Sequence, residues 1–200
     1  MSSIAQQTVT DFLNALAAPT PAPGGGAAAA ITGGAAAALV EMVAGLSSTK
    51  SPDGADADLQ RRTATSMAKT RDELLVLADD DATAYSAFIQ AMRLPKGDEA
   101  ERAARARAMS TAAEEAARIP LQTLRAITAI AESARLLTGR SLASAASDLE
   151  VALRFARAAG LSAADNVEVN LPFIDDPEIR ATLANQTAAA VSLLERTTQA

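Results

Sequence analysis

Residues 21–40 read Pro21-Ala22-Pro23-Gly24-Gly25-Gly26 and continue as Ala27-Ala28-Ala29-Ala30-Ile31-Thr32-Gly33-Gly34-Ala35-Ala36-Ala37-Ala38-Leu39-Val40. Proline fixes φ and lacks an N–H, whereas glycine permits close approach to the backbone. The segment therefore predicts a turn that opens a central helix, apolar nearly all round. Free backbone N–H groups at the start of such a helix suit an anionic or amide-rich ligand. We interpret this segment as the floor of a pocket.

The composition of the whole chain predicts a single all-α domain over residues 1–200. Apolar residues make up 49% of the chain and aromatic residues only 2%, so Ala, Leu, Val and Ile must build the core. Alanine is the best helix former, and alternating β-branched or aromatic runs are scarce. A chain of 200 residues is long enough to bury a substantial core.

Apolar spacing and turn residues predict an antiparallel bundle of five to six helices. The Asp98 and Glu101 pair resembles a capping box, and Pro177 suits the first position of a final helix. Pro120 lies inside a predicted helix, so we expect a kink or break near Arg118. The expected helices cover residues 4–17, 26–46, 57–92 and 98–138, a segment from 144 past 160, and 177–198.

Charge and missing residue types exclude several classes of function. The net charge of −6 argues against a nucleic-acid partner. The chain has no Cys and no His, which excludes thiol nucleophiles, disulfides, histidine bases and the usual zinc sites. Any catalysis must therefore use carboxylates, Lys, Tyr or backbone groups, and we expect no metal.

An uncharged run over residues 12–40 is long enough to raise the question of a membrane span. Prolines and glycines interrupt this run, and alanine is only weakly hydrophobic, so a buried core helix is the better interpretation. No Lys or Arg precedes Lys50, so the basic start of a signal peptide is missing. We expect a soluble cytoplasmic protein with no membrane partner.

Asp81 is the strongest candidate for chemistry. It follows Asp79 and Asp80 on a predicted helix and lies seven residues from both Leu74 and Phe88, so it falls on the apolar stripe. Burial raises the pKa of an unpaired carboxyl group, which then suits proton transfer near neutral pH. The alternative is a structural acid satisfied by an arginine or by a helix N-terminus.

Four further residues have both a functional and a structural interpretation. Asp148 shares a face with apolar residues but also suits an N-terminal cap. Lys96 lies in a basic-leaning stretch that would attract an anionic substrate, or that forms a solvated helix start. Asn166 and Asn170 are four residues apart, so on a helix they would face one ligand edge together; such residues also cap helices and turns.

Five motifs in order resemble the cyclodeaminase/cyclohydrolase family, which includes the C-terminal domain of formiminotransferase-cyclodeaminase and the stand-alone methenyltetrahydrofolate cyclohydrolases. Each motif alone is weak, but their order and spacing are specific over about residues 9–194. The motifs are residues 21–40 with Glu41-Met42-Val43-Ala44, Asp79-Asp80-Asp81-Ala82-Thr83-Ala84-Tyr85, Ala91-Met92-Arg93-Leu94-Pro95-Lys96, Ser147-Asp148-Leu149, and Asn166-Val167-Glu168-Val169-Asn170-Leu171.

The resemblance implies an all-helical subunit that forms a homodimer, with a reduced-folate pocket at or near the subunit interface. It places the catalytic acid/base at Asp81 and requires no cofactor besides the folate substrate. The Ala-rich second helix and the scarcity of large side chains also favour pairing through close-packed small residues, because one chain alone has limited apolar area to bury. The substrate-binding residues that we expect are Gly24, Gly25, Gly26, Lys96, Asp148, Asn166 and Asn170.

The expected reaction is that of a methenyltetrahydrofolate cyclohydrolase, which adds water to a cationic amidinium carbon with help from a carboxylate. The alternative within the family is a formiminotetrahydrofolate cyclodeaminase, which releases ammonia. The lysine-rich segment common in the family is reduced to Lys50 here, which favours a third hypothesis of another cation-like heterocycle. A non-catalytic helical dimerisation or binding module with the same fold is the fourth.

Overall fold

The structure, a computed structural model, describes residues 3–199 as six α-helices and three short 3-10 helices, with no strand in that range. This confirms the predicted all-α class. The α-helices are α1 (Val9–Ala17), α2 (Gly25–Lys50), α3 (Ala57–Met92), α4 (Glu99–Leu137), α5 (Ala146–Glu168) and α6 (Pro177–Gln199). The 3-10 helices are η1 (Ile4–Gln6), η2 (Ala143–Ala145) and η3 (Leu171–Phe173).

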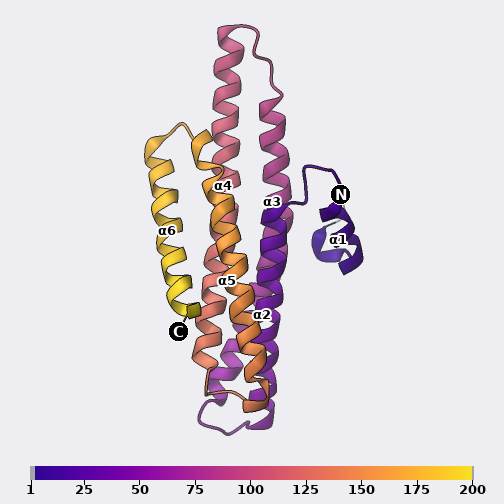
Figure 1. Cartoon of the computed structure of the whole chain (residues 1–200), viewed down its shortest axis with the longest axis vertical. Helices are drawn as coiled ribbons and strands as arrows, with labels where there is room; N and C mark the ends of the chain where they lie inside the picture. Colours follow the sequence, from indigo (N-terminus) through magenta and orange to yellow (C-terminus); the bar gives the residue numbers. More distant parts are fainter. Residues whose placement is uncertain (1–2, 200) are drawn as a thin grey trace.

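The helices form an elongated bundle around α2 (Figure 1). Helix α2 packs against α3, α4 and α5, while α6 covers α4 and α5. Helices α3 and α4 form a long hairpin whose tip extends beyond the other helices, and α1 lies to one side of the bundle (Figure 1). The N-terminus of α2 therefore lies part-way along the α3–α4 hairpin, while its C-terminus reaches the opposite end of the molecule.

Small residues let α2 occupy the centre of the bundle. A Cβ atom on Gly33 would lie 2.7 Å from Cγ1 of Ile127 in α4, so only glycine allows that approach. By length and composition α2 could cross a membrane, and it is the one such helix in residues 3–199. More than half of its apolar window is buried against other helices, as expected for the core helix that the sequence predicts.

The structure corrects the expected break in the fourth helix. Helix α4 continues from Glu99 to Leu137 with Pro120 inside it, so of the expected kink or break near Arg118 the break was wrong. Pro120 is buried, and the carbonyl group of Ala116, which proline leaves without its helical donor, accepts a hydrogen bond of 3.0 Å from Asn170 Nδ2. A side chain distant in sequence thus replaces the missing N–H, and the helix continues.

Candidate active site

A cavity of about 240 Å³ opens at the N-terminus of α2. Chain segments from the glycine turn, α3, α4 and the end of α5 surround it. Its lining residues are Pro21, Ala22, Gly24, Gly25, Gly26, Asp81, Tyr85, Ala116, Asn166, Val169 and Asn170. The structure therefore brings together the three glycines, Asp81 and both asparagines that the sequence singles out.

Asp81 and the glycine turn fit together closely. The carboxyl group of Asp81, on α3, lies where a Cβ atom on Gly26 would lie, so a residue with a side chain at position 26 would displace it. The backbone N–H of Ala27 donates a hydrogen bond to Asp81. Because Gly24, the N-cap residue of α2, has no side chain to cap the helix, the carboxyl group of Asp81 caps it from a neighbouring helix.

Burial raises the pKa of Asp81 above its ordinary value of 3.8, and the hydrogen bond from Ala27 opposes part of that rise. Asp81 is thus satisfied by a helix N-terminus, as the structural alternative expects, and also has the perturbed pKa that the functional interpretation expects. Among the described residues, no Lys or Arg lines the cavity, so no such side chain there neutralises the carboxylate. This group can exchange protons with a bound ligand at a higher pH than an ordinary aspartate.

Both asparagines have their amide nitrogens engaged with the backbone. Asn170 Nδ2 donates to the carbonyl oxygens of Ala116 (3.0 Å) and Asn166 (2.8 Å). Asn166 Nδ2 donates to the carbonyl oxygen of Ser162 (2.7 Å). The carboxamide oxygens of both residues remain as hydrogen-bond acceptors. Together with Asp81, they make the cavity suited to a ligand edge that carries N–H groups or positive charge.

Tyr85 lines the cavity but is absent from the residues that the sequence predicted for the site. It is the only tyrosine in the chain, and its side chain is 42% exposed. Its position four residues after Asp81 places it one helical turn further along the same face of α3. That spacing is the signal that could have identified it. The hydroxyl group of Tyr85 adds a group that can both donate and accept a hydrogen bond to the cavity lining.

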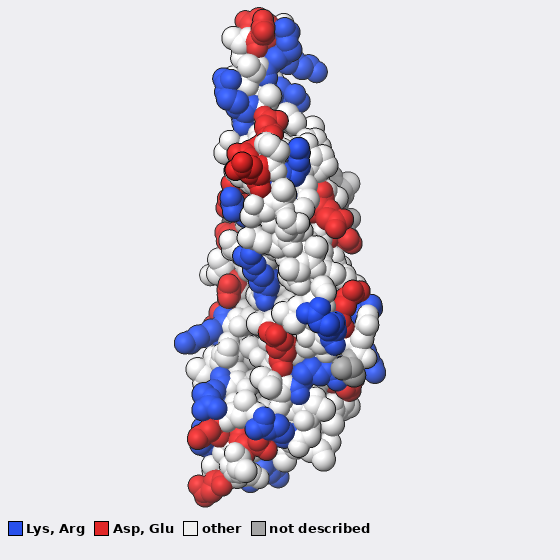
Figure 2. Space-filling model, turned by 90° about the vertical axis from the view of Figure 1, so that its left-hand side faces the viewer, with Lys and Arg blue, Asp and Glu red and all other residues white. Residues whose placement is uncertain are grey.

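Lys96 does not line the Asp81 cavity. It lies in the exposed turn between α3 and α4, beyond the end of α3 at Met92, and Met92 is about 16 Å along the helix from Asp81. Figure 2 shows this tip of the molecule with Lys and Arg intermixed with Asp and Glu. A role for Lys96 in substrate binding stays a prediction.

Asp148 lies at the opposite end of α5 from the cavity. It is half-buried in the first turn of α5, whereas Asn166 is in the last turn, about 27 Å away along the helix. Within one chain the structure therefore separates Asp148 from Asp81. Its expected role in substrate binding also stays a prediction.

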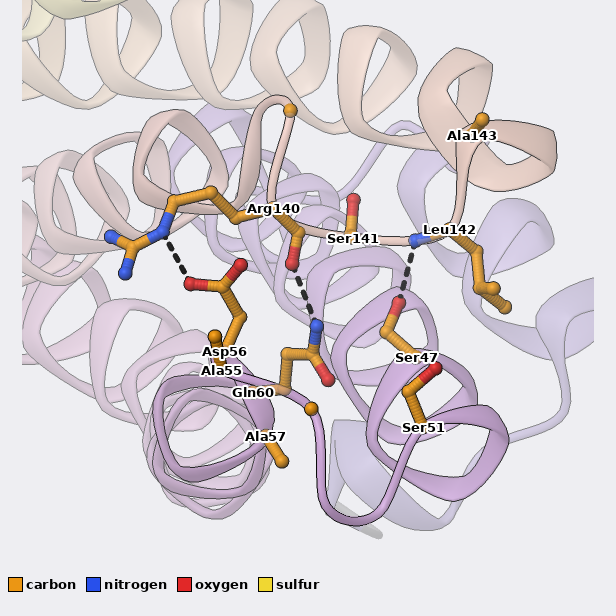
Figure 3. A pocket seen from close by; sticks show the side chains of 12 residues that line it. Ser47, Ser51, Ala55, Asp56, Ala57, Gln60, Arg140, Ser141, Leu142 and Ala143 are labelled. Carbon is orange, nitrogen blue, oxygen red and sulfur yellow. Dashed lines mark hydrogen bonds and ion pairs between the residues drawn. The ribbon is translucent and has the colours of Figure 1, made fainter.

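A second hollow of about 360 Å³ lies at that opposite end, between the α2–α3 loop and the α4–α5 connection (Figure 3). Gln60 Nε2 donates to the carbonyl oxygen of Arg140 (2.7 Å), and Arg140 Nε donates to Asp56 Oδ1 (2.7 Å). The backbone N–H of Leu142 donates to Ser47 Oγ (2.9 Å). These hydrogen bonds link the connection between α4 and α5 to the C-terminal part of α2 and the start of α3. The polar groups of this hollow therefore stabilise the packing at this end of the bundle.

Comparisons with known proteins identify a family that matches most of the chain. A family model described as formiminotransferase-cyclodeaminase matches residues 8–189. Methenyltetrahydrofolate cyclohydrolase of Methylorubrum extorquens is 37% identical over 171 residues, covering 85% of this chain and 82% of that protein. Formimidoyltransferase-cyclodeaminase of Gallus gallus is 29% identical over 169 residues, covering 84% of this chain but 31% of that longer protein.

A solved structure has the same fold. The crystal structure of formiminotetrahydrofolate cyclodeaminase from Thermotoga maritima superposes with a TM-score of 0.88 at 26% sequence identity. The superposition covers 98% of this chain and 94% of that one.

Proposed function

The chain belongs to the formiminotransferase-cyclodeaminase family of folate enzymes, and within that family we propose that it is a methenyltetrahydrofolate cyclohydrolase. In the proposed reaction, 5,10-methenyltetrahydrofolate and water give 10-formyltetrahydrofolate. The observation that carries the proposal is Asp81, a carboxyl group with a raised pKa in a cavity whose lining, within residues 3–199, contains no Lys or Arg. The cyclohydrolase of Methylorubrum extorquens, at 37% identity, supports the choice of reaction.

The proposed chemistry requires one group that takes and returns a proton. The carboxylate of Asp81 accepts a proton from water as the water oxygen forms a bond to the amidinium carbon. The same proton then passes to the ring nitrogen as the bond between that nitrogen and the carbon breaks. The second proton of the water leaves to solvent when the formyl carbonyl forms, so the positive charge of the substrate ends as a free proton.

Electrostatics of the cavity favour the cationic substrate. The lining presents the Asp81 carboxyl group and two carboxamide oxygens, and it contains no Lys or Arg. A negative or acceptor-rich lining stabilises an amidinium cation and its transition state without reorganising solvent. A substrate that carried a negative charge at its reacting end would be repelled from the same cavity.

A cyclodeaminase is the second candidate, favoured by the Thermotoga maritima superposition at a TM-score of 0.88. In that reaction a folate nitrogen attacks the formimino carbon, and ammonia leaves after receiving a proton. Asp81 can serve as the proton shuttle in either reaction. The two candidates therefore differ in the substrate that turns over, which an assay decides directly.

The test follows the absorbance of 5,10-methenyltetrahydrofolate with purified wild-type protein and the Asp81→Asn variant. We expect turnover in the wild type and a loss of about 100-fold or more in the variant, the usual range for removing a general base. Asp80→Asn is the matched control, since it removes an exposed carboxyl group next to Asp81 and should retain activity.

Ammonia release from 5-formiminotetrahydrofolate, without hydrolysis of the methenyl compound, would identify the cyclodeaminase instead. A folded wild-type protein that turns over neither compound would overturn both candidates. It would leave another heterocyclic substrate, or a binding module, as the remaining hypotheses.

We also propose that the chain functions as a homodimer that pairs through the open side of α2. Ala35, Met42 and Leu46 are exposed on that helix at spacings of seven and four residues, so they form one stripe. Glu41 and Lys50 are the charged residues of α2, and Glu41 is paired with Arg71 on α3. Sedimentation should give a dimer that Met42→Asp weakens and that Val9→Asp, an exposed change on α1, does not. A wild-type monomer would contradict this proposal.

A further inference from the structure

Pro120 leaves one carbonyl group of α4, beside the Asp81 cavity, without its helical hydrogen-bond donor. In an α-helix the N–H of each residue donates to the carbonyl oxygen four residues earlier, and proline has no N–H. The carbonyl oxygen of Ala116 therefore has no donor within α4. Asn170 Nδ2 occupies that place with a hydrogen bond of 3.0 Å.

Asn170 also donates a hydrogen bond to a carbonyl group at the end of α5 that lacks its helical donor. Helix α5 ends at Glu168, and the backbone N–H of Asn170 donates to Val167 (3.1 Å) instead of to Asn166. The carbonyl oxygen of Asn166 accepts the second N–H of the Asn170 side chain, at 2.8 Å. One carboxamide group thus satisfies two carbonyl groups on two helices.

The two hydrogen bonds fix the orientation of the Asn170 carboxamide group. Rotation of the carboxamide group by 180° would place Oδ1 against the carbonyl oxygens of Ala116 and Asn166. All three oxygens are acceptors, so no hydrogen bond could form between them. Both N–H groups are used, so Oδ1 is the one polar atom of this side chain that remains for a ligand. Ala116, Asn170 and Asp81 all line the same cavity.

We propose that Pro120 is a positioning residue for the Asp81 cavity. Because Pro120 has no N–H to donate, the carbonyl oxygen of Ala116 stays available to accept from the Asn170 carboxamide group and holds it in place. Asn170 Oδ1 then accepts a hydrogen bond from an N–H of the bound heterocycle. The identity of that heterocycle, a reduced folate, rests on the proposed function. Proline inside a helix is unfavourable, so this account also explains what a proline contributes at position 120.

The first test is equilibrium binding of 5-formyltetrahydrofolate, a reduced folate that is not the substrate of the proposed hydrolysis. Pro120→Ala restores an N–H that competes for the Ala116 carbonyl, so we expect a higher Tm but binding weakened by about five- to tenfold, as for one lost hydrogen bond. KM should rise with it more than kcat falls. Gly45→Ala is the matched control, because it places a methyl group in open space on α2, far from Asn170.

A double-mutant cycle separates positioning from packing. Asn170→Ala should weaken binding at least as much as Pro120→Ala, and the double variant should bind no worse than Asn170→Ala alone. Additive losses, or unchanged binding in Pro120→Ala, would overturn the proposal. A merely structural proline would change Tm without this coupling.

The second test needs no ligand. The side-chain amide resonances of Asn170, assigned by their loss in Asn170→Ala, should shift and exchange faster with water in Pro120→Ala. Unchanged resonances would overturn the positioning role. If the wild type binds no reduced folate, the proposed function fails, while these resonances still decide whether Pro120 orients Asn170.

Discussion

The carboxyl group of Asp81 lies in the space that a Cβ atom of residue 26 would fill, so Gly26 and Asp81 determine each other's place. Gly26 is the second residue of α2, and Asp81 is on α3. The N–H of Ala27, the next residue of α2, donates to the same carboxyl group. Because Gly26 has no side chain, the carboxyl group of Asp81 can lie against the N-terminus of α2.

Gly26→Ala should strongly reduce activity without unfolding the protein. The added methyl group overlaps the Asp81 carboxyl group, which must move away from Ala27 and from the cavity. We expect kcat/KM for 5,10-methenyltetrahydrofolate to fall by about 100-fold, comparable to loss of the base itself. Gly34→Ala, a buried helical position with nothing within 4 Å of the new Cβ atom, should retain activity. Full activity in Gly26→Ala would show that Asp81 need not lie against α2.

The raised pKa of Asp81 predicts how stability depends on pH. The folded chain binds this proton more tightly than the unfolded chain, so the free energy of unfolding falls as pH rises from 3.8 through the folded-state pKa. Asp81→Asn removes that loss while keeping an oxygen to accept the N–H of Ala27. Its stability relative to the wild type should therefore increase with pH across this range.

Denaturant unfolding of both proteins over a pH series measures this difference. The matched control is Asp80→Asn, which removes an exposed carboxyl group from the same turn of α3. A stability difference between Asp81→Asn and wild type that stays constant, or shrinks with rising pH, would contradict the raised pKa.

Local periodicity was enough to place Asp81 among buried apolar residues. The seven-residue spacing from Asp81 to Leu74 and Phe88 places all three on one face of a helix, and the structure buries Leu74 and Phe88 while half-burying Asp81. The Gly24–Gly26 turn likewise predicts a helix start at which a polar group can bind. Both inferences need only helix geometry, which a short sequence contains.

Helix periodicity alone could not predict which helix ends meet at the cavity. Nothing local in the sequence tells which end of α5 lies at the cavity, so the placement of Asn166 in its lining and of Asp148 far from it could not be predicted. The expectation that the helix could break near Arg118, before Pro120, was wrong for a similar reason. Its missing N–H is replaced by Asn170, fifty residues away in the sequence.

Ser47→Ala should destabilise the end of the bundle that Figure 3 shows. Ser47 is 2% exposed, and its hydroxyl oxygen accepts from the N–H of Leu142 while it donates to the carbonyl oxygen of Val43 (2.7 Å). Removing it leaves the N–H of Leu142 without that acceptor, at a cost of about 1–3 kcal/mol. Tm should fall by roughly 2–4 °C for each kcal/mol in a chain of this size.

Ser48→Ala is the control for this prediction, because the Ser48 hydroxyl group donates only within its own helix, to Gly45. Folate turnover should survive in both variants at a temperature where both are folded, since Ser47 lies at the far end of α2 from Asp81. An equal Tm in Ser47→Ala and Ser48→Ala would mean that the Leu142 contact contributes little.

Asp79→Ala should release the N-terminal segment from the bundle. The Asp79 carboxyl group accepts hydrogen bonds from Ser3 Oγ (2.6 Å) and from the backbone N–H of Ile4 (2.7 Å). Ile4 and Phe12 are buried in a small cluster that is separate from the main core. Helix α1 lies to one side of the bundle in Figure 1, and η1 packs on α3, so the hydrogen bonds to Asp79 connect this segment to the bundle.

Hydrogen exchange measured by mass spectrometry tests this anchor. Hydrogen bonds to a charged group each contribute about 1.5–3 kcal/mol, so exchange over residues 4–17 should accelerate by about tenfold or more in Asp79→Ala. Exchange in the core of α4 should stay as in the wild type, and Asp80→Ala, one residue further along, should change neither region. If residues 4–17 exchange at the wild-type rate in Asp79→Ala, the apolar cluster around Phe12 holds the segment by itself.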